Sequence, residues 1–157
     1  MSTQETSNVQ GLVLVNAQYI KDLSFENPRA PYSLMETEKP DINIDLDVKA
    51  DQIHENTFEV IINVTVNADS GGTIFVVDLS YAGLFTITDD MNQNAKEMVL
   101  LVHCPNILFP YVRRIISDIT RDGGFPPLML APVDFMGLYY AKKQETENQQ
   151  NGNKLNS

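Results

Sequence analysis

Two neighbouring segments alternate between apolar and polar side chains, and this pattern constrains the fold of the chain most strongly. In Asp41–Ala50 each second residue from Ile42 is apolar, and Asp, Asn or Lys stands between them. Thr57–Ala68 repeats the alternation, with apolar residues at each second position from Phe58. Because successive side chains of a strand point to opposite faces of a sheet, we predict two strands, each with one buried face and one solvent-exposed face.

A third strand is predicted over Thr73–Ile87. The residues Asp69–Gly72 before it form a turn, because glycine adopts positive φ angles without steric cost, and Thr57–Ala68 then pairs with Thr73–Ile87 as an antiparallel hairpin. Thr73–Ile87 is apolar on both of its faces. A strand covered on one side only would not need this, so either helices or another subunit must cover its second face.

The N-terminal part of the chain adds a first strand and a long loop. Gly11–Ser24 alternates more weakly and is predicted as the first strand. The segment Phe25–Pro40 follows it and contains three prolines, which block regular strand pairing. We therefore expect a long crossover loop between the first two strands, and loops of this length in compact domains are often functional.

The last third of the chain is predicted to be helical. Asn106–Arg121 carries an apolar stripe at helical spacing, and Gly123-Gly124 ends this helix. After an extended, proline-rich connection, a second helix is predicted to start near Val133. Strands followed by helices indicate an α+β fold, with a four-stranded antiparallel sheet, a long crossover loop between its first and second strands, and two C-terminal helices.

Composition places these elements in a single domain of residues 11–143. The polar segments 1–10 and 144–157 lack apolar periodicity and are predicted to be disordered tails. No apolar run approaches the roughly 18 residues that span a bilayer, and the N-terminus has no positive charge before its short apolar run. The single cysteine indicates a reducing compartment. We therefore expect a cytoplasmic protein without direct membrane insertion.

The net charge of −10 is unevenly distributed along the chain. Residues 1–100 hold 16 acidic and 5 basic side chains, whereas residues 101–157 hold 5 acidic and 6 basic ones. An acidic surface repels phosphate backbones, so nucleic acid is not expected as a partner. It would attract basic partners and speed their encounter, but it could equally serve solubility alone.

The residue types that could carry chemistry do not form a recognisable set. Tetrahedral zinc needs three or four ligands, and the chain has one Cys and two His. His103 and Cys104 are neighbours on a predicted extended segment, so their side chains point to opposite sides and His103 cannot readily act as a base for the thiol. Asp45 and Asp47 are interpreted as part of a solvent-exposed strand face. Cys104 is interpreted as a thiol that packs in the core. We predict no catalytic residue, no metal and no cofactor.

Apolar side chains of the crossover loop and the second helix are the remaining candidates for function. They are either ordinary core or an exposed or gated groove, and in soluble proteins such a groove usually marks an interaction site. Methionines and aromatic residues suit a site that accepts varied side chains. The physical pattern alone leaves both interpretations open. The residues are Phe25, Tyr32, Leu34, Met35, Leu128, Phe135, Met136, Leu138 and Tyr139.

Three blocks of the chain resemble the SecB family of bacterial export chaperones. They are Tyr19–Pro31, the hairpin that ends at Gly83–Phe85, and the block from Cys104 to Phe135 that matches CPNILFPY…FP…L.LAPV.F. With the strands between them, the similarity covers about residues 12–143. The resemblance implies a homotetramer, a dimer of dimers, whose helices lie between two sheets. It implies a tetramer interface at Leu108, Val112, Ile115, Ile116 and Ile119.

The resemblance also implies a function, that of an ATP-independent holdase. Such a chaperone binds unfolded secretory precursor proteins, keeps them competent for translocation, and delivers them to the SecA ATPase. The SecA-binding residues would be Asp22, Glu26, Val76 and Asp78. The client-binding groove would contain Ile42, Ile44, Leu46, Leu128, Phe135, Leu138 and Tyr139. Alternatives are a SecB-like chaperone dedicated to one client, such as an antitoxin, and more distantly a small-molecule-binding α+β protein.

The chain departs from the family pattern at several of these positions. The family more often has Leu at Val76 and Glu at Asp78, so the charge is retained with a shorter reach. Val112 stands in place of a usual Ala, and Arg114 in place of a usual acidic residue. Lys142-Lys143 stands where more apolar residues are common, and this pair could shorten the groove.

Overall fold

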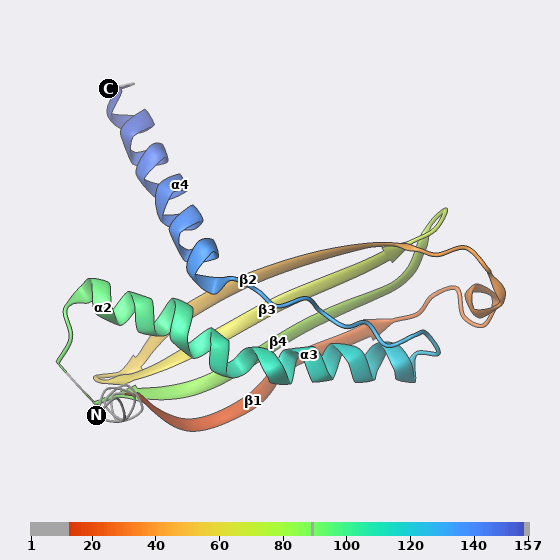
Figure 1. Cartoon of the computed structure of the whole chain (residues 1–157), viewed down its shortest axis with the longest axis horizontal. Helices are drawn as coiled ribbons and strands as arrows, with labels where there is room; N and C mark the ends of the chain where they lie inside the picture. The colour runs from red at the N-terminus through yellow and green to blue at the C-terminus, as the bar shows by residue number, and fades with distance from the viewer. Residues whose placement is uncertain (1–12, 89, 156–157) are drawn as a thin grey trace, which may run out of the picture.

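The computed structural model describes residues 13–88 and 90–155, in which an antiparallel sheet carries helices on one face (Figure 1). The strands are β1 (Val13–Glu26), β2 (Asp41–His54), β3 (Thr57–Asp69) and β4 (Thr73–Ile87). Their spatial order is β1-β4-β3-β2, so β1 and β2 form the edges of the sheet. The predicted α+β class and four-stranded antiparallel sheet are confirmed. The N-terminal tail predicted over residues 1–10 lies outside the described residues.

Strand pairing gives the sheet two chemically different faces. Val60, Ile62, Val64 and Val66 of β3 are fully or almost fully buried on the face toward the helices. Their neighbours along β3 point to the opposite face, which we call the outer face. Asp78 of β4 lies on this outer face, because its register partner Thr65 falls between the buried β3 residues. The alternation of the sequence thus separates an apolar helix-facing side from a polar outer side.

The two-faced apolar character of β4 follows from its central position between β1 and β3. Phe75, Val77, Leu79 and Phe85 are buried on the helix-facing side. On the outer face Val76 and Leu84 are only half-buried. Helices therefore account for one apolar face of β4, and the described chain covers the other face incompletely.

The crossover loop between β1 and β2 contains a short 3₁₀ helix, η1 (Tyr32–Met35). Two side chains attach this loop to the rest of the fold. Asn27 donates from Nδ2 to the carbonyl oxygen of Gly123 at 3.0 Å, and Arg29 donates from Nη1 to the carbonyl oxygen of Ser70 at 2.9 Å. The loop is thereby held against both the end of the long helix and the β3–β4 turn.

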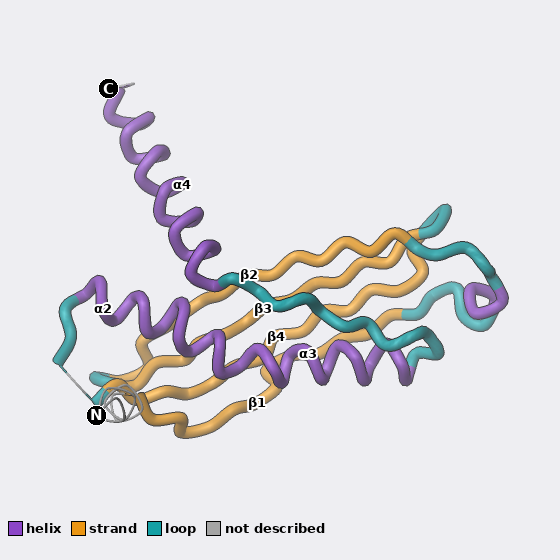
Figure 2. Tube along the Cα trace, in the orientation of Figure 1, coloured by secondary structure: helices purple, strands orange, loops and turns teal. Residues whose placement is uncertain are grey.

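The first helical part of the chain is longer than predicted. It comprises α2 (Gln93–Met98), a π-helical segment η2 (Val99–His103) and α3 (Cys104–Asp122) without interruption (Figure 2). The sequence prediction began only at Asn106, because the proline at Pro105 marks a typical helix start. Proline lacks an amide donor and displaces the preceding turn, and the wider π segment accommodates it here.

This continuous helix corrects a second prediction. His103 ends η2 and Cys104 begins α3, so neither lies on an extended segment. The Oδ1 atom of Asn92 accepts a hydrogen bond from the backbone N–H of Ala95 at 2.8 Å and caps the true start of the helix. Gln93–Asp122 is long and apolar enough to cross a membrane, but half of its most apolar window is buried, and the core helix of a soluble protein meets the same criterion.

The last helix, α4 (Phe135–Leu155), follows an extended connection of residues 123–134. The connection runs back along the helix-covered face beside α3, and α4 then projects away from the sheet (Figure 1). Residues 144–155 are helical and exposed, which differs from the disordered tail predicted from residue 144. Gln, Glu and Lys are good helix formers, and extending an existing helix avoids the cost of nucleation, so this segment needs no apolar face.

Candidate functional site

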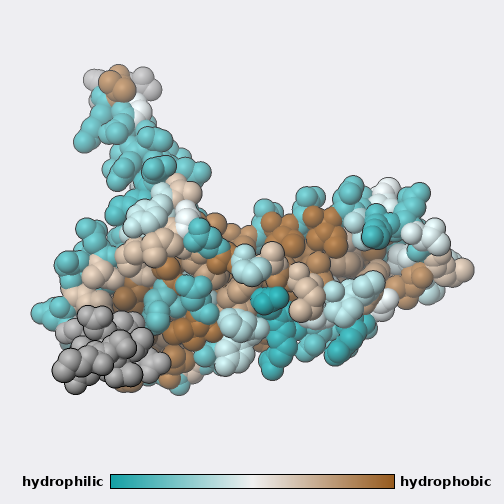
Figure 3. Space-filling model, viewed as in Figure 1, coloured by the Kyte–Doolittle hydropathy of each residue, from teal (hydrophilic) through white to brown (hydrophobic). Residues whose placement is uncertain are grey.

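An exposed apolar strip lies on the helix-facing side of β2. Ile42 pairs with buried Ala68 and Ile44 pairs with buried Val66, so both isoleucines point to the side of the helices. α3 crosses β3 and β4 and leaves this end of β2 uncovered. Ile42 is 40% exposed and Ile44 is 44% exposed. Apolar side chains form a band on this face of the molecule (Figure 3).

The strip continues along β2 toward α4. Leu46 is half-buried and Val48 is buried, and both share the helix-facing side with Ile42 and Ile44. Alternate residues of a strand are about 6.5–7 Å apart, so the row from Ile42 to Val48 extends roughly 20 Å. This length matches an extended peptide segment of about six residues.

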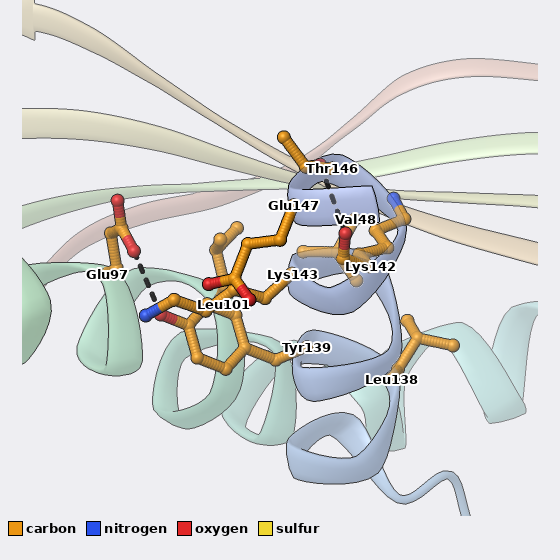
Figure 4. A pocket seen from close by; sticks show the side chains of 9 residues that line it. All are labelled: Val48, Glu97, Leu101, Leu138, Tyr139, Lys142, Lys143, Thr146 and Glu147. Carbon is orange, nitrogen blue, oxygen red and sulfur yellow. Dashed lines mark hydrogen bonds between the residues drawn. The ribbon is translucent and has the colours of Figure 1, made fainter. Parts of the chain in front are cut away.

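A pocket of about 350 Å³ lies at the Val48 end of the strip, between α4, α2, η2 and β2 (Figure 4). Val48, Leu101 and Leu138 give it an apolar lining, and charged side chains stand around them. The remaining lining residues are Glu97, Tyr139, Lys142, Lys143, Thr146 and Glu147.

Polar contacts tie α4 to its neighbours around this pocket. The hydroxyl of Tyr139 donates to Oε2 of Glu97 at 2.8 Å (Figure 4), and this hydrogen bond raises the pKa of Tyr139 above its ordinary value. Lys142 forms an ion pair with Asp47 of β2. The ammonium of Lys143 lies 5.7 Å from the centre of the Tyr139 ring, within the range of a cation–π contact.

The seven predicted groove residues occupy four environments. Ile42, Ile44 and Leu46 form the strip, and Leu138 and Tyr139 line the pocket. Phe135 is only 2% exposed and packs edge-on against Phe109 with ring centres 5.7 Å apart, so in this conformation it supports the groove from below. Leu128 is half-buried in the connection beside the core.

Sequence reasoning missed five residues that line the pocket, and two of them, Thr146 and Glu147, lie in the segment predicted to be a disordered tail. The alternation of β2 could have identified Val48, because this residue belongs to the same apolar row as Ile42. Glu97 and Leu101 lie on the helical segment that was not predicted. Their signal was the run of good helix formers after the capping residue Asn92.

A second candidate surface lies on the outer face of the sheet. The register of β1 with β4 places Glu26 opposite Val76 and Ser24 opposite Asp78, and Asp22 lies two pairs further along, opposite Ser80. The four predicted SecA-binding residues are therefore neighbours on one face. Asp22, Glu26 and Asp78 are exposed, and Val76 is half-buried among them.

Neutral side chains surround these carboxylates. Thr65 donates from Oγ1 to Oδ1 of Asp78 at 2.8 Å, which orients that carboxylate. Within residues 13–88 and 90–155, the ion pairs involve neither Asp22, Glu26 nor Asp78. Three exposed negative charges without a salt-bridge partner favour a basic ligand.

The apolar stripe of α3 faces the sheet of its own chain. Leu108, Val112 and Ile116 are fully buried there. A side chain already packed against its own sheet adds little surface to a contact with a second subunit, so the role of these residues in one chain is core packing. Arg114 of α3 is exposed, and Tyr111 is 42% exposed although its ring stacks on Tyr81 of β4 with ring centres 5.9 Å apart.

The single thiol is part of the core. Cys104 is fully buried, and burial raises the pKa of its thiol to about 12. Among the residues that the structure describes, no group of three or more His, Cys, Asp and Glu side chains is arranged to hold a metal ion. The arrangement has two candidate binding surfaces on opposite faces of the sheet, one apolar and one acidic.

Comparison with known proteins identifies the family of the chain. A family model described as preprotein translocase subunit SecB matches residues 6–146. The chain belongs to the SecB family. Protein-export protein SecB of Rhodopseudomonas palustris strain HaA2 is 47% identical over 137 residues, covering 86% of each chain. That of Maricaulis maris strain MCS10 is 48% identical over 130 residues, covering 82% of this chain and 75% of the relative.

A solved structure agrees with the SecB fold. The SecB-like chaperone of Mycobacterium tuberculosis, in complex with a peptide from an antitoxin, matches with a TM-score of 0.61. The match covers 81% of this chain and 95% of that chain at 20% sequence identity, so it bears on the fold alone. The family model and the relatives confirm the family resemblance of the sequence blocks.

Proposed function

We propose that this SecB-family chain is a cytoplasmic, ATP-independent holdase that binds unfolded precursor proteins and delivers them to SecA for export. The observation that carries the proposal is the placement of an exposed apolar strip and an unneutralised acidic patch on opposite faces of one sheet. A client on one face leaves the other face free. The chaperone can therefore hold a client and contact a second protein at the same time, without a catalytic step.

The apolar strip supports client binding by burial of side chains. Burying a Leu- or Phe-sized group contributes roughly 1.5–3 kcal/mol, so contacts with Ile42, Ile44 and Leu46 together contribute roughly 4.5–9 kcal/mol before binding costs, which supports a weak and reversible contact at each strip. The contacts are not specific for one sequence. Binding to the unfolded form in preference to the folded form opposes folding of the client by mass action.

The acidic patch supports delivery to SecA. Exposed carboxylates attract a basic surface over a distance of about 10 Å at moderate ionic strength, and they speed encounter more than they add affinity. Such a contact is reversible and sensitive to salt. It therefore suits a transfer step, in which the chaperone must leave after delivery.

Assembly into a homotetramer, a dimer of dimers, would multiply these surfaces. Several strips on one particle raise the apparent affinity for a long unfolded chain, because the second contact is intramolecular. The exposed residues Tyr111 of α3 and Leu14, Val15 and Ile20 of β1 support the proposal, since single chains rarely leave so many large apolar side chains open to water.

The first test distinguishes client binding at the apolar strip from nonspecific hydrophobic binding elsewhere on the surface. The double variant Ile42→Ser/Ile44→Ser should shorten the time for which several unrelated unfolded precursors remain unfolded, measured by their refolding fluorescence. Ile53→Ser is the matched control, because Ile53 is an exposed isoleucine of the same strand outside the strip. Equal loss in both variants, or holding of one client only, would contradict the proposal.

The second test concerns the acidic patch. Asp22→Asn/Glu26→Gln removes two charges with almost no change of shape, and we expect SecA binding to weaken by about tenfold at low ionic strength and less at high salt. Asp51→Asn/Glu55→Gln changes the net charge equally at other exposed positions and should have little effect. Calorimetric titration measures both. A parallel loss of client holding in the first variant would show that the acidic patch is assigned to the wrong partner.

A further inference from the structure

Strand β2 forms one edge of the sheet, since within residues 13–88 and 90–155 it pairs with β3 and with no other strand (Figure 1). In an antiparallel ladder, alternate residues of an edge strand direct their backbone N–H and C=O groups away from the sheet. Outside the ladders, neither the backbone nor the side-chain hydrogen bonds of the described residues involve the backbone of Asp41–Leu46. This segment therefore presents unpaired donors and acceptors over roughly 20 Å.

The two edge strands differ in regularity. β2 pairs with β3 without a register shift from Asp41 to Gln52. β1, the opposite edge, has two register shifts within Val15–Asp22. A bulge bends an edge and interrupts its row of hydrogen-bonding groups, and natural proteins use bulges and prolines to block strand addition. β2 contains no proline and no such interruption before Gln52, so it is the edge suited to an added strand.

The side chains on either side of this edge define what an added strand must carry. Ile42, Ile44 and Leu46 line the helix-facing side, and Asp41 and Asp45 are exposed on the outer face. In the part of the chain that the structure describes, the ion pairs involve neither of these two carboxylates. Because side chains of neighbouring strands lie directly opposite one another, the added strand would place apolar residues beside the isoleucines and basic residues beside the aspartates.

The charges of the edge oppose a second copy of β2 as the occupant. Two such strands side by side would bring aspartates against aspartates, and like charges directly opposite are destabilising. A segment of an unfolded protein that alternates apolar and basic residues has no such conflict. Its backbone supplies hydrogen bonds whatever its sequence is, and its side chains add a preference.

We propose that β2 binds an unfolded chain by strand addition, in which about six client residues extend the sheet beside Asp41–Leu46. The client strand alternates apolar residues, which pack beside Ile42 and Ile44, with basic residues, which face Asp41 and Asp45. The identity of the partner as an unfolded precursor rests on the holdase function proposed above, whereas the edge pairing does not. Backbone recognition accounts for a binder that accepts many sequences, because every segment without proline carries the same hydrogen-bonding groups.

The probe is an acetylated and amidated peptide of about seven residues that alternates lysine and valine, long enough to span Asp41–Leu46. It is added to the full-length chain, and hydrogen exchange is followed by NMR. We expect exchange to slow at the alternate amides of Asp41–Leu46 that face the edge, while the intervening amides, already bonded to β3, change little. Absence of protection at β2, protection at β1 instead, or failure of the peptide to bind would overturn strand addition.

A peptide of the same composition, with its lysines in one block and its valines in another, is the matched control. It has the same charge and apolar content but cannot place valines on one face and lysines on the other. We expect calorimetric titration to give an affinity about tenfold lower for this peptide, because several cross-strand pairs are lost. Equal affinity of the two peptides would show that binding follows composition rather than strand register, and the proposal would fail.

Charge variants test the outer row of the edge. Asp41→Asn/Asp45→Asn keeps the shape of both side chains and should weaken binding of the alternating peptide about three- to tenfold at low ionic strength. Asp51→Asn/Glu55→Gln removes the same charge at exposed positions near the other end of β2 and should leave the affinity unchanged. Equal weakening by both variants would show attraction by net charge alone and would overturn the pairing of charges at the edge.

The outcomes separate strand addition from the holdase function. If Ile42→Ser/Ile44→Ser abolishes holding of precursors but no β2 amide gains protection, clients bind the strip through side chains and only strand addition fails. If the β2 amides gain protection but precursors are not held, the holdase function fails and the edge remains a peptide-binding site.

Discussion

Gly83 of β4 lies against Leu108 of α3. A Cβ atom at this position would be 2.5 Å from Cε2 of Phe85 and 2.9 Å from Cδ2 of Leu108. Both neighbours are fully buried and have no space to move into. The glycine is therefore required by close packing rather than by a special backbone angle.

Substitution of Gly83 should test this packing directly. We expect Gly83→Ala to lower the free energy of unfolding by about 1–3 kcal/mol, because overpacking forces buried side chains out of their rotamers. Urea denaturation followed by circular dichroism measures the change. Gly152→Ala on α4 is the control, since a Cβ there meets nothing within 4 Å and alanine is the better helix former, so stability should stay equal or rise slightly. Equal effects at both positions would show that the contact is not tight.

The buried thiol of Cys104 predicts a dependence of stability on high pH. Its pKa is about 12 in the folded chain and 9.0 ordinarily, so the folded state retains a proton that the unfolded state loses. The contribution to stability is complete below about pH 9 and decreases as the pH rises toward 12. We expect the free energy of unfolding to fall over this range in urea titrations, and to fall less steeply in Cys104→Ala. Part of the decline should remain, because burial and Glu59 also raise the pKa of Tyr19 to about 12. An unchanged slope would contradict burial of the thiol.

Among the structural elements, the connection between α3 and α4 depends on one hydroxyl. Thr120 is fully buried; its Oγ1 donates to the carbonyl oxygen of Ile116 at 2.8 Å and accepts from the backbone N–H of Leu128 at 3.0 Å. The connection is thereby fixed alongside the last turn of α3. The contact holds the first half of the connection that leads to α4.

Replacement of this hydroxyl should loosen the connection. Thr120→Val keeps the shape of the side chain but leaves the N–H of Leu128 without its acceptor, which should cost about 1–3 kcal/mol of stability. Hydrogen exchange should show faster loss of protection at Leu128 than in the strands. Thr120→Ser retains the hydroxyl and should restore most of that protection. If Thr120→Val keeps the protection of Leu128 and Thr120→Ser loses it, the methyl packing and not the hydrogen bond holds the connection.

An element was predicted from the sequence where a short stretch of residues carries its pattern, and it was missed where no such pattern exists. The strands β2 and β3 were predicted from alternation and the turn at Gly71-Gly72 from glycine, whose φ angles of 64° and 130° bear this out. The helix over residues 93–103 was missed, because Pro105 is typical of a helix start and a π segment that accommodates it has no simple pattern. An apolar stripe in the sequence also does not show what covers it. The apolar stripe of α3 packs on its own sheet, whereas the apolar row of β2 remains exposed.

At the scale of the whole molecule, the two edges of the sheet differ in chemistry. The β2 edge carries Asp41, Asp45, Asp47 and Asp51, and like charges on a strand edge oppose pairing with a second copy. The β1 edge carries Leu14, Val15 and Ile20, all about half exposed. Subunit contacts of the proposed tetramer are therefore expected at β1 and at the exposed side of α3, which leaves the β2 strip free for clients.

This division predicts which substitutions disrupt assembly. The native mass of the chain should be about four times 17.6 kDa in sedimentation or native mass spectrometry. Ile20→Lys places a charge on the 49% exposed β1 position and should shift the chain to smaller species, since burial of an unpaired ammonium in a contact is costly. Ile53→Lys makes the same change at a 58% exposed position on β2 and should leave the mass unchanged. A stable monomer in the parent chain would exclude the tetramer, and equal dissociation by both variants would exclude β1 as the preferred contact. Dissociation by Ile20→Lys with retained affinity of each strip for a short peptide would show that assembly supplies avidity and not the binding site itself.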